Sequence, residues 1–174
     1  MLSTYHSPAS KGCTGFTLIE LTIALLLIAT LAAWGLPSFQ AFGRNTAVIS
    51  DVNRLQTAFS LARNTAITQR TTVSVCPTDS SRSACISDWS QDFMVLKGVT
   101  ISPALNDDIV RIFPALPETT VSYSRGWQRV SYNPMGHTSG FNGRFEICAE
   151  NAQGRTLILS QLGRLRIDDT PIRC

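Results

Sequence analysis

The most apolar part of the chain lies near its start. Residues 16–36 read FTLIELTIALLLIATLAAWGL and carry one charged side chain, Glu20. A helix of this length extends about 30 Å, which is enough to cross a bilayer. The main alternative is a cleaved secretory signal, but such signals usually have a shorter apolar core that follows a basic region. The pattern therefore predicts a membrane-spanning helix over residues 16–36.

A helical period continues after Pro37. Apolar side chains recur at alternating four- and three-residue steps and make one stripe: Val48, Val52, Leu55, Phe59, Ala62 and Ala66,. The stripe predicts that residues 37–70 form an amphipathic second half of the same helix, ending near residue 70. This half would pack against a sheet.

From residue 71 onward the pattern changes to short β-favouring runs separated by turn residues. The runs are TTVSV, DFMVL, DIVRIF, TTVSY, RVSY, RFEICA, RTLILS and RLRI,. They predict an antiparallel meander over residues 71–174, packed on the helix. The expected fold class is α+β, with one compact domain of roughly 140 residues beside the apolar segment.

Glu20 is unusual because a carboxylate inside hydrocarbon costs about 2.5 to 3.5 kcal/mol on insertion scales. If the bond between Gly15 and Phe16 is cut, a new amino group appears four residues before Glu20. In a stack of parallel helices, one subunit's carboxylate can then meet a neighbour's ammonium. The alternative is that Glu20 sits at the level of the lipid headgroups.

The residues Gly15-Phe16-Thr17-Leu18-Ile19-Glu20 resemble the processing site of type IV prepilins. The resemblance implies that residues 1–15 are a leader, that prepilin peptidase cuts after Gly15 and that Phe16 is N-methylated. It also implies a helix bend at Pro37 and an inner-membrane precursor with its head in the periplasm. The expected partners are other minor and major pilins and the inner-membrane assembly platform.

Cysteines number five, and removal of the leader with Cys13 leaves Cys76, Cys85, Cys148 and Cys174. An even number in an exported chain indicates disulfides. Three pairings are possible, of which the sequence-local one joins Cys76 to Cys85 and Cys148 to Cys174. Zinc is the competing explanation, but no C-x-x-C spacing or nearby histidine favours it.

The head resembles the GspH/FimT subfamily of pseudopilins and minor pilins. Cys76-Pro77, Trp89 and DFMVL carry the likeness at its start, and Cys148, RTLILSQLGRLRI and Cys174 carry it at its end. The implied function is a minor pilin near the tip of an extracellular type IV pilus, acting in twitching motility and DNA uptake. The alternative is the corresponding pseudopilin of a type II secretion system. A periplasmic binding protein with a cleaved signal is a third class.

Gly163-Arg164-Leu165-Arg166 resembles the GRxR motif of FimT-like minor pilins that capture DNA during natural transformation. Glycine permits a tight turn, and residues two apart on a strand project from one face. Arg164 and Arg166 could therefore meet phosphates of double-stranded DNA without reading its sequence, and Arg155 and Arg173 could extend the patch. The alternative is that Arg164 and Arg166 pair with Asp168 and Asp169.

The overall charge adds little to this picture, because a formal net charge of +3 does not by itself indicate nucleic acid,. No catalytic residue, cofactor or metal site is expected. The two histidines are His6, in the leader, and His137, alone in a predicted turn. The sequence lacks phosphate-cradling, zincin and nucleophile-elbow motifs.

Overall fold

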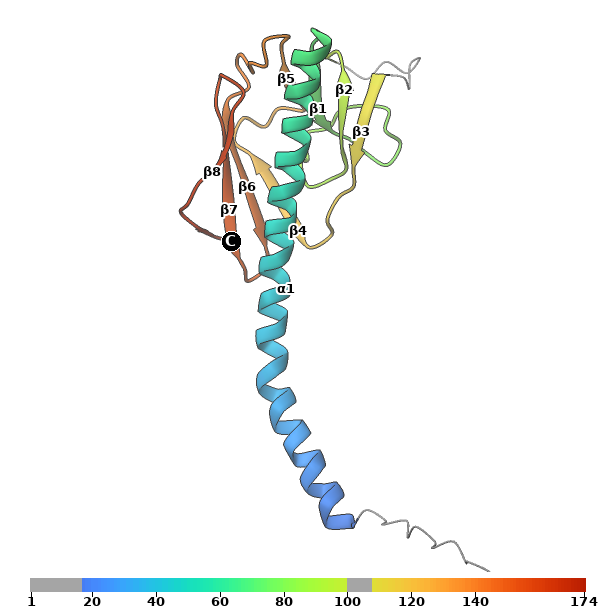
Figure 1. Cartoon of the computed structure of the whole chain (residues 1–174), viewed down its shortest axis with the longest axis vertical. Helices are drawn as coiled ribbons and strands as arrows, with labels where there is room; N and C mark the ends of the chain where they lie inside the picture. The colour runs from blue at the N-terminus through green and yellow to red at the C-terminus, as the bar shows by residue number, and fades with distance from the viewer. Residues whose placement is uncertain (1–16, 100–107) are drawn as a thin grey trace, which may run out of the picture. The chain divides into compact units, whose positions relative to one another are not determined.

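A computed structural model describes residues 17–99 and 108–174, with only the backbone at residues 36–38, 40 and 41 (Figure 1). Its α-helix, α1, spans Leu18–Gln69. The Glu20 amide donates to the Thr17 hydroxyl over 3.3 Å, so Thr17 caps the helix start,. At the other end Arg70 is left-handed, with φ of 49°, and the Thr71 amide donates to the Ala66 carbonyl over 3.2 Å. This Schellman arrangement ends the helix near residue 70, as predicted.

The chain divides into two compact units, Met1–Phe39 and Gln40–Cys174. In the first unit, Leu18–Gly35 has a mean hydropathy of 2.1 and no buried residue. By length and composition this segment can cross a membrane, in agreement with the predicted span. Pro37 lies within α1, and the bend there stays a prediction.

The second unit, called the head below, contains two antiparallel sheets. The first has the order β3-β2-β1-β5 and is built from β1 (Val73–Pro77), β2 (Phe93–Lys97), β3 (Ile109–Phe113) and β5 (Val130–Tyr132). The second has the order β4-β6-β7-β8 and is built from β4 (Thr119–Tyr123), β6 (Gly143–Ala149), β7 (Gln153–Leu159) and β8 (Leu165–Ile167). A short strand, β9 (Ile172–Arg173), also pairs with β7.

The predicted single meander is wrong, because the two sheets exchange strands. After β3 the chain crosses to the second sheet for β4 and then returns to the first, where β5 pairs with β1. It then crosses again to form β6, β7 and β8. Turn residues mark where a strand ends but not which partner the next strand takes. The strand positions were therefore predictable, whereas the sheet order was not.

One core joins α1 to both sheets, and Figure 1 shows the head portion of α1 lying across them. Every residue of the predicted helix stripe is buried in it. Phe59 connects the layers: its ring centroid lies 6.4 Å from that of Tyr132 in the first sheet and 5.2 Å from that of Phe145 in the second. Trp89, fully buried after the Cys76–Cys85 disulfide, stacks on Phe59 at 6.0 Å and also lies 5.0 Å from Phe145.

A buried ion pair fastens α1 to the connection between β3 and β4. Asp51 is fully buried, accepts a 2.6 Å hydrogen bond from Arg54 Nε and accepts another of 2.6 Å from the Thr119 hydroxyl. The Arg54 guanidinium also donates to the Pro114 carbonyl and lies 4.3 Å from the centroid of the Phe93 ring. Burial lowers the pKa of Arg54, and the neighbouring Asp51 opposes that shift.

All four cysteines of the head are in disulfides, with the sequence-local pairing. Cys76 bonds Cys85, and Cys148 bonds Cys174. The second bond lies against Gly154, where an added Cβ would come within 2.5 Å of Cys174 Sγ. These thiols are therefore not free to hold zinc. In residues 17–99 and 108–174, no group of three His, Cys, Asp or Glu side chains could hold a metal ion.

Substitution of Asp51 by Ala should strand a buried guanidinium and lower the free energy of unfolding of the head by about 3 to 5 kcal/mol. Urea denaturation of a fragment covering residues 40–174 measures this loss. Ser50→Ala, at the exposed neighbouring position, is the matched control and should change stability by less than about 0.5 kcal/mol. If Asp51→Ala were as mild as this control, the ion pair would not hold the helix to the sheet connection.

Candidate nucleic-acid interface

The turn between β7 and β8 is built around Gly163. The Gly163 amide donates to the Ser160 carbonyl over 3.0 Å, and the Arg164 amide donates to the Ser160 hydroxyl over 3.1 Å. Gly163 has φ of +75°, and an added Cβ would lie 2.1 Å from the Gly136 carbonyl oxygen and 2.9 Å from the Tyr132 ring. Glycine is therefore required here by the tight turn, as expected, and also by the close approach of a second loop.

Arg164 and Arg166 are both exposed, on either side of Leu165 in the sequence. Leu165 packs against the core, so the alternation of the strand directs its two neighbours away from it,. At about 3.3 Å per residue, their backbone positions are about 7 Å apart. This placement agrees with the predicted pair of guanidinium groups on one face.

The alternative pairing of these arginines with Asp168 and Asp169 is not observed. Among residues 17–99 and 108–174 the ion pairs are Asp51–Arg54 and Arg82–Asp92. Asp168 instead accepts a hydrogen bond from the Thr170 amide over 3.2 Å. Within the described chain, Arg164 and Arg166 are thus exposed cations that no carboxylate neutralises.

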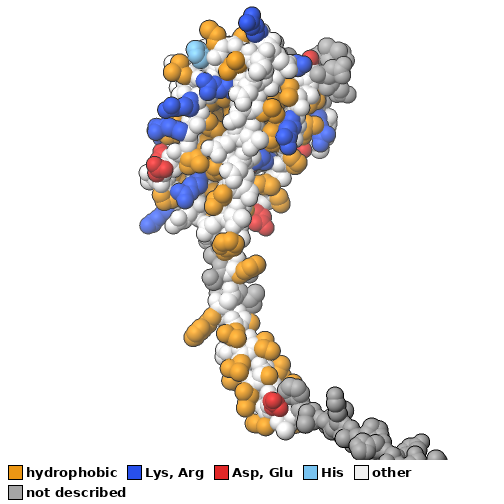
Figure 2. All heavy atoms as spheres, in the orientation of Figure 1, with side chains coloured by type: hydrophobic (Ala, Val, Ile, Leu, Met, Phe, Trp, Pro, Cys, Tyr) orange, Lys and Arg blue, Asp and Glu red, His pale blue; other side chains and the backbone are white. Residues whose placement is uncertain are grey.

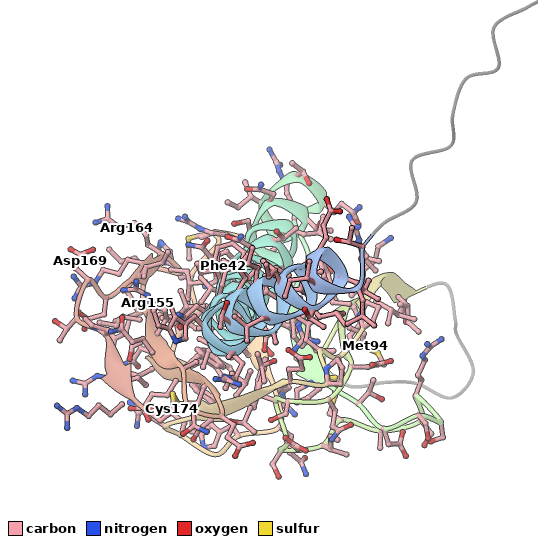
Figure 3. All side chains as sticks on the ribbon, turned by 90° about the horizontal axis from the view of Figure 1, so that it is seen from below. Phe42, Met94, Arg155, Arg164, Asp169 and Cys174 are labelled. Carbon is pink, nitrogen blue, oxygen red and sulfur yellow. A yellow bond between two sulfur atoms is a disulfide. The ribbon has the colours of Figure 1, made fainter. Side chains whose placement is uncertain are left out.

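The register of β7 separates Arg155 and Arg173 from this pair. Residues directly opposite each other in an antiparallel pair lie on the same face of the sheet, and so do residues two apart along one strand. Arg166 opposes Ile158, whereas Arg173 opposes Gln153, whose face also holds Arg155 and the buried Leu157. The side chains of Arg155 and Arg164 are labelled in Figure 3. The predicted four-arginine patch is therefore not brought together on one face.

Sequence reasoning missed a different arginine on the face of Arg166. Arg144 in β6 opposes Ile158 in β7, which in turn opposes Arg166 in β8. Arg144 and Arg166 are thus two strands apart, about 10 Å, on the face turned from the core. Arg144 is exposed and precedes the buried Phe145. The alternation of buried and exposed residues within RFEICA predicts the face of the strand on which Arg144 lies. The sequence does not show which strand lies beside β6.

The next set of residues that lie side by side across β6, β7 and the end of β8 includes two acids, Glu146 and Asp168. Glu146 opposes Thr156, and the Asp168 amide donates to the Thr156 carbonyl over 2.8 Å. Figure 2 shows Lys and Arg side chains gathered along the edge of the head where β8 lies, with acidic side chains among them. On this face of the second sheet the arginines therefore lie at the turn end, at Arg144, Arg164 and Arg166.

The apolar N-terminal helix and the two-sheet head define a type IV pilin-like protein. A search with family sequence models matches residues 51–163 to "Type II transport protein GspH" and residues 10–36 to "Prokaryotic N-terminal methylation motif". The chain belongs to the GspH family of type IV minor pilins and pseudopilins, whose members are structural subunits and not enzymes.

The fold is similar to that of the type IV minor pilin FimU of Pseudomonas aeruginosa. One crystal form is 19% identical over 71% of this chain and 96% of that chain, with a TM-score of 0.57. A second form is also 19% identical, over 72% and 97%, with a TM-score of 0.53. At this identity the likeness shows the fold alone. Among curated proteins no sequence matches the chain.

Two predicted site residues, Gly15 and Phe16, lie outside the described residues. Glu20 is exposed in the first turn of α1. Negative charge in the first turn is favoured by the helix dipole. Its proposed role in assembly is therefore separate from any packing within its own chain.

Gly163→Ala should destabilise the head by more than about 2 kcal/mol, because it combines a left-handed backbone with a steric clash against the Gly136 loop. Gly126→Ala is the matched control, since Gly126 also has positive φ, +63°, but open space around it. That control should cost about 1 kcal/mol. Urea denaturation of both variants separates the two contributions, and equal losses would mean that the close approach to Gly136 has no energetic weight.

Proposed function

We propose that this chain is a minor pilin of a type IV pilus, cut after Gly15 and methylated at Phe16. The precursor is a single-pass inner-membrane protein with its head in the periplasm. The mature subunit then joins other minor and major pilins in an extracellular filament, near its tip, through the inner-membrane assembly platform. The observation that carries this proposal is the methylation motif at residues 10–36, followed by an apolar span at Leu18–Gly35 and a pilin-like head.

The chemistry of the first turn supports a role for Glu20 in assembly. Thr17 already satisfies the Glu20 amide, so the helix start does not need the carboxylate as a cap,. Cleavage after Gly15 would create an ammonium at Phe16. Pairing of that ammonium with Glu20 of an adjacent subunit neutralises both charges within the apolar layer. A charge pair at one depth also selects one axial register between neighbouring helices.

A type IV pilus is favoured over a type II secretion filament by the cysteine-rich head and by the GRLR sequence. The two machines share the processing site and the apolar helix, and the family description itself names type II transport. The likeness to FimU agrees with either machine at the level of fold. The two assignments are therefore distinguished by function in the cell. The alternative to a type IV minor pilin is the corresponding pseudopilin of a type II secretion system.

Glu20→Gln should abolish incorporation of the subunit into filaments, because the neighbour's ammonium would lose its counter-charge. Glu150→Gln, at an exposed acid of the head, is the matched control and should assemble normally. Twitching motility, natural transformation and protein secretion are compared in a deletion strain complemented with each variant. Mass spectrometry of the complemented wild type should find a mature chain that begins at methylated Phe16.

Three results would contradict this scheme. A mature chain beginning beyond residue 36 would exclude filament incorporation and favour a periplasmic binding protein with a cleaved signal. Loss of secretion alone in the deletion strain would assign the chain to a type II secretion system. Full activity of both Glu20→Gln and the uncut precursor would remove the proposed charge pairing.

We further propose that the head binds double-stranded DNA through Arg144, Arg164 and Arg166. The spacing of about 7 Å between Arg164 and Arg166 and of about 10 Å across the sheet to Arg144 allows contacts with successive phosphates and with a second part of the DNA backbone. Guanidinium groups suit phosphate because they donate two parallel hydrogen bonds. The absence of carboxylate partners within the described chain leaves these donors available. Such binding is independent of sequence and weakens with salt.

Arg144→Gln combined with Arg166→Gln should weaken binding of duplex DNA more than tenfold at about 0.1 M salt, because two phosphate contacts are lost. The slope of log Kd against log salt should fall by about two. Fluorescence anisotropy with the fragment 40–174 measures both. The double variant Arg155→Gln with Arg173→Gln removes the same charge from the other face and should have a much smaller effect. Equal effects of the two pairs, or no binding by the wild type at low salt, would refute this interface.

A further inference from the structure

A groove between α1 and the β7–β8 turn adjoins the basic face of the second sheet. One cavity there, of about 630 Å³, is lined by polar residues of α1 together with Phe59 and Leu61, by Tyr132 and by Gly163, Arg164 and Leu165. A second, of about 470 Å³, is lined by Arg63, Ile158, Ser160, Leu162, Arg164 and Arg166. Arg63 and Arg164 line both cavities, so the two volumes are the lobes of one groove with these arginines between them.

Arg63 is held in place by a loop of the head and still keeps free donors. Its Nε donates to the Gly136 carbonyl over 3.1 Å, the same carbonyl that approaches Gly163. A guanidinium has five N–H donors, so the four on its terminal nitrogens are available to a ligand. Arg164 is fixed at its backbone by Ser160 through the turn already described. The Arg63 side chain is thus held directly, and Arg164 is held at its backbone.

The chemistry of the lining favours an anion. Three arginines border the groove, and no carboxylate is among the residues that line either lobe. Arginines that share a cavity repel one another unless an anion lies between them. Ser60 adds a hydroxyl and Gln56 an amide from α1, and both can donate to phosphate oxygens,. The Thr57 hydroxyl also lines the groove but already donates to the Asn53 carbonyl over 2.7 Å.

Tyr132 gives an independent sign that the groove is incomplete as it stands. The side chain is fully buried, and its hydroxyl has no hydrogen-bond partner in the described chain. A buried hydroxyl without a partner is unfavourable, and a water molecule or ligand atom admitted beside it would recover part of that cost. Burial raises the pKa of this phenol, so it stays protonated and can donate a hydrogen bond.

We propose that this groove is a phosphate-binding site, with Arg63 of α1 and Arg164 of the turn as its central ligands and Arg166 at its far end. The nucleic-acid backbone is the phosphate source that the neighbouring basic face favours, and this assignment of the source rests on the DNA binding proposed above. The groove brings a residue of the helix, 101 positions before Arg164, into the interface. Arg63 would anchor the phosphate strand between the helix and the sheet.

The experiment uses the full chain in zwitterionic detergent micelles, with two probes, inorganic pyrophosphate and a short labelled duplex. Arg63→Gln should weaken duplex binding about five- to tenfold at about 0.1 M salt and lower the salt slope by about one. Arg111→Gln, at an exposed arginine of β3 that does not line the groove, should leave both values unchanged. NMR of arginine Nε–Hε groups should show pyrophosphate shifting the Arg63 and Arg164 signals.

A second pair of variants tests the groove without touching the bond between Arg63 and Gly136. Ser60→Glu places a carboxylate in the groove and should weaken binding of both probes at least as much as Arg63→Gln. Ser50→Glu adds the same charge at an exposed position on the same helix, outside the groove, and should have little effect. Thermal melting of every variant confirms that the head remains folded.

The outcomes separate this inference from the proposed function. If Arg63→Gln and Ser60→Glu bind duplex and pyrophosphate like the wild type, the groove is excluded while the outer arginine face still stands. If pyrophosphate binding depends on Arg63 but the wild type binds no duplex, the phosphate groove is supported and the DNA proposal fails. If poly-glutamate binds in an Arg63-dependent way and pyrophosphate does not, the groove takes an acidic segment of a protein partner, and the inference is overturned.

Discussion

The burial of one face of α1 against two sheets at once is the constraint on which the head depends. The helix crosses both sheets, and Phe59 contacts an aromatic ring in each. Trp89 also joins the sheets, because its ring lies near Phe93 of the first and Phe145 of the second. The exchange of strands between the sheets has a related effect. Since β4 and β5 belong to different sheets, neither sheet is a contiguous piece of chain that could fold apart from the other. The helix and the strand exchange thus make the head one cooperative unit.

The same packing decides where charge can be displayed. The inward face of the second sheet is occupied by Phe145, Ile147, Leu157 and Leu159, so charged residues of β6 and β8 project from the other side. Arginines occupy the row near the turn, and acids occupy the next row. The groove beside α1 extends this separation of charge, because Arg63 faces the turn that carries Arg164. The basic character of the turn end of the second sheet therefore results from strand register as much as from composition.

Much of the fold was predictable from the sequence, because helical and strand periods are local properties. The stripe from Val48 to Ala66 gave the buried face of α1, and the alternating runs gave eight of the strands; the short β9 was not predicted. The sheet order could not be predicted, since it depends on which distant strands pair. The candidate site divides in the same way. Arg164 and Arg166 share a short motif, whereas the face of Arg155 and the roles of Arg144 and Arg63 depend on register and packing across long sequence separations.

The bond between Cys148 and Cys174 closes a covalent loop that contains the whole of β7, β8 and β9. Cys174, directly after β9, is thereby fastened to β6, an interior strand of the second sheet. Mechanical load on the head therefore cannot peel β9 away from the sheet without breaking this bond or displacing β6. In a reducing compartment the bond would open, and the edge that carries Arg164 and Arg166 would become the weakest part of the head. The display of its basic edge is thus coupled to the oxidation state of Cys148 and Cys174.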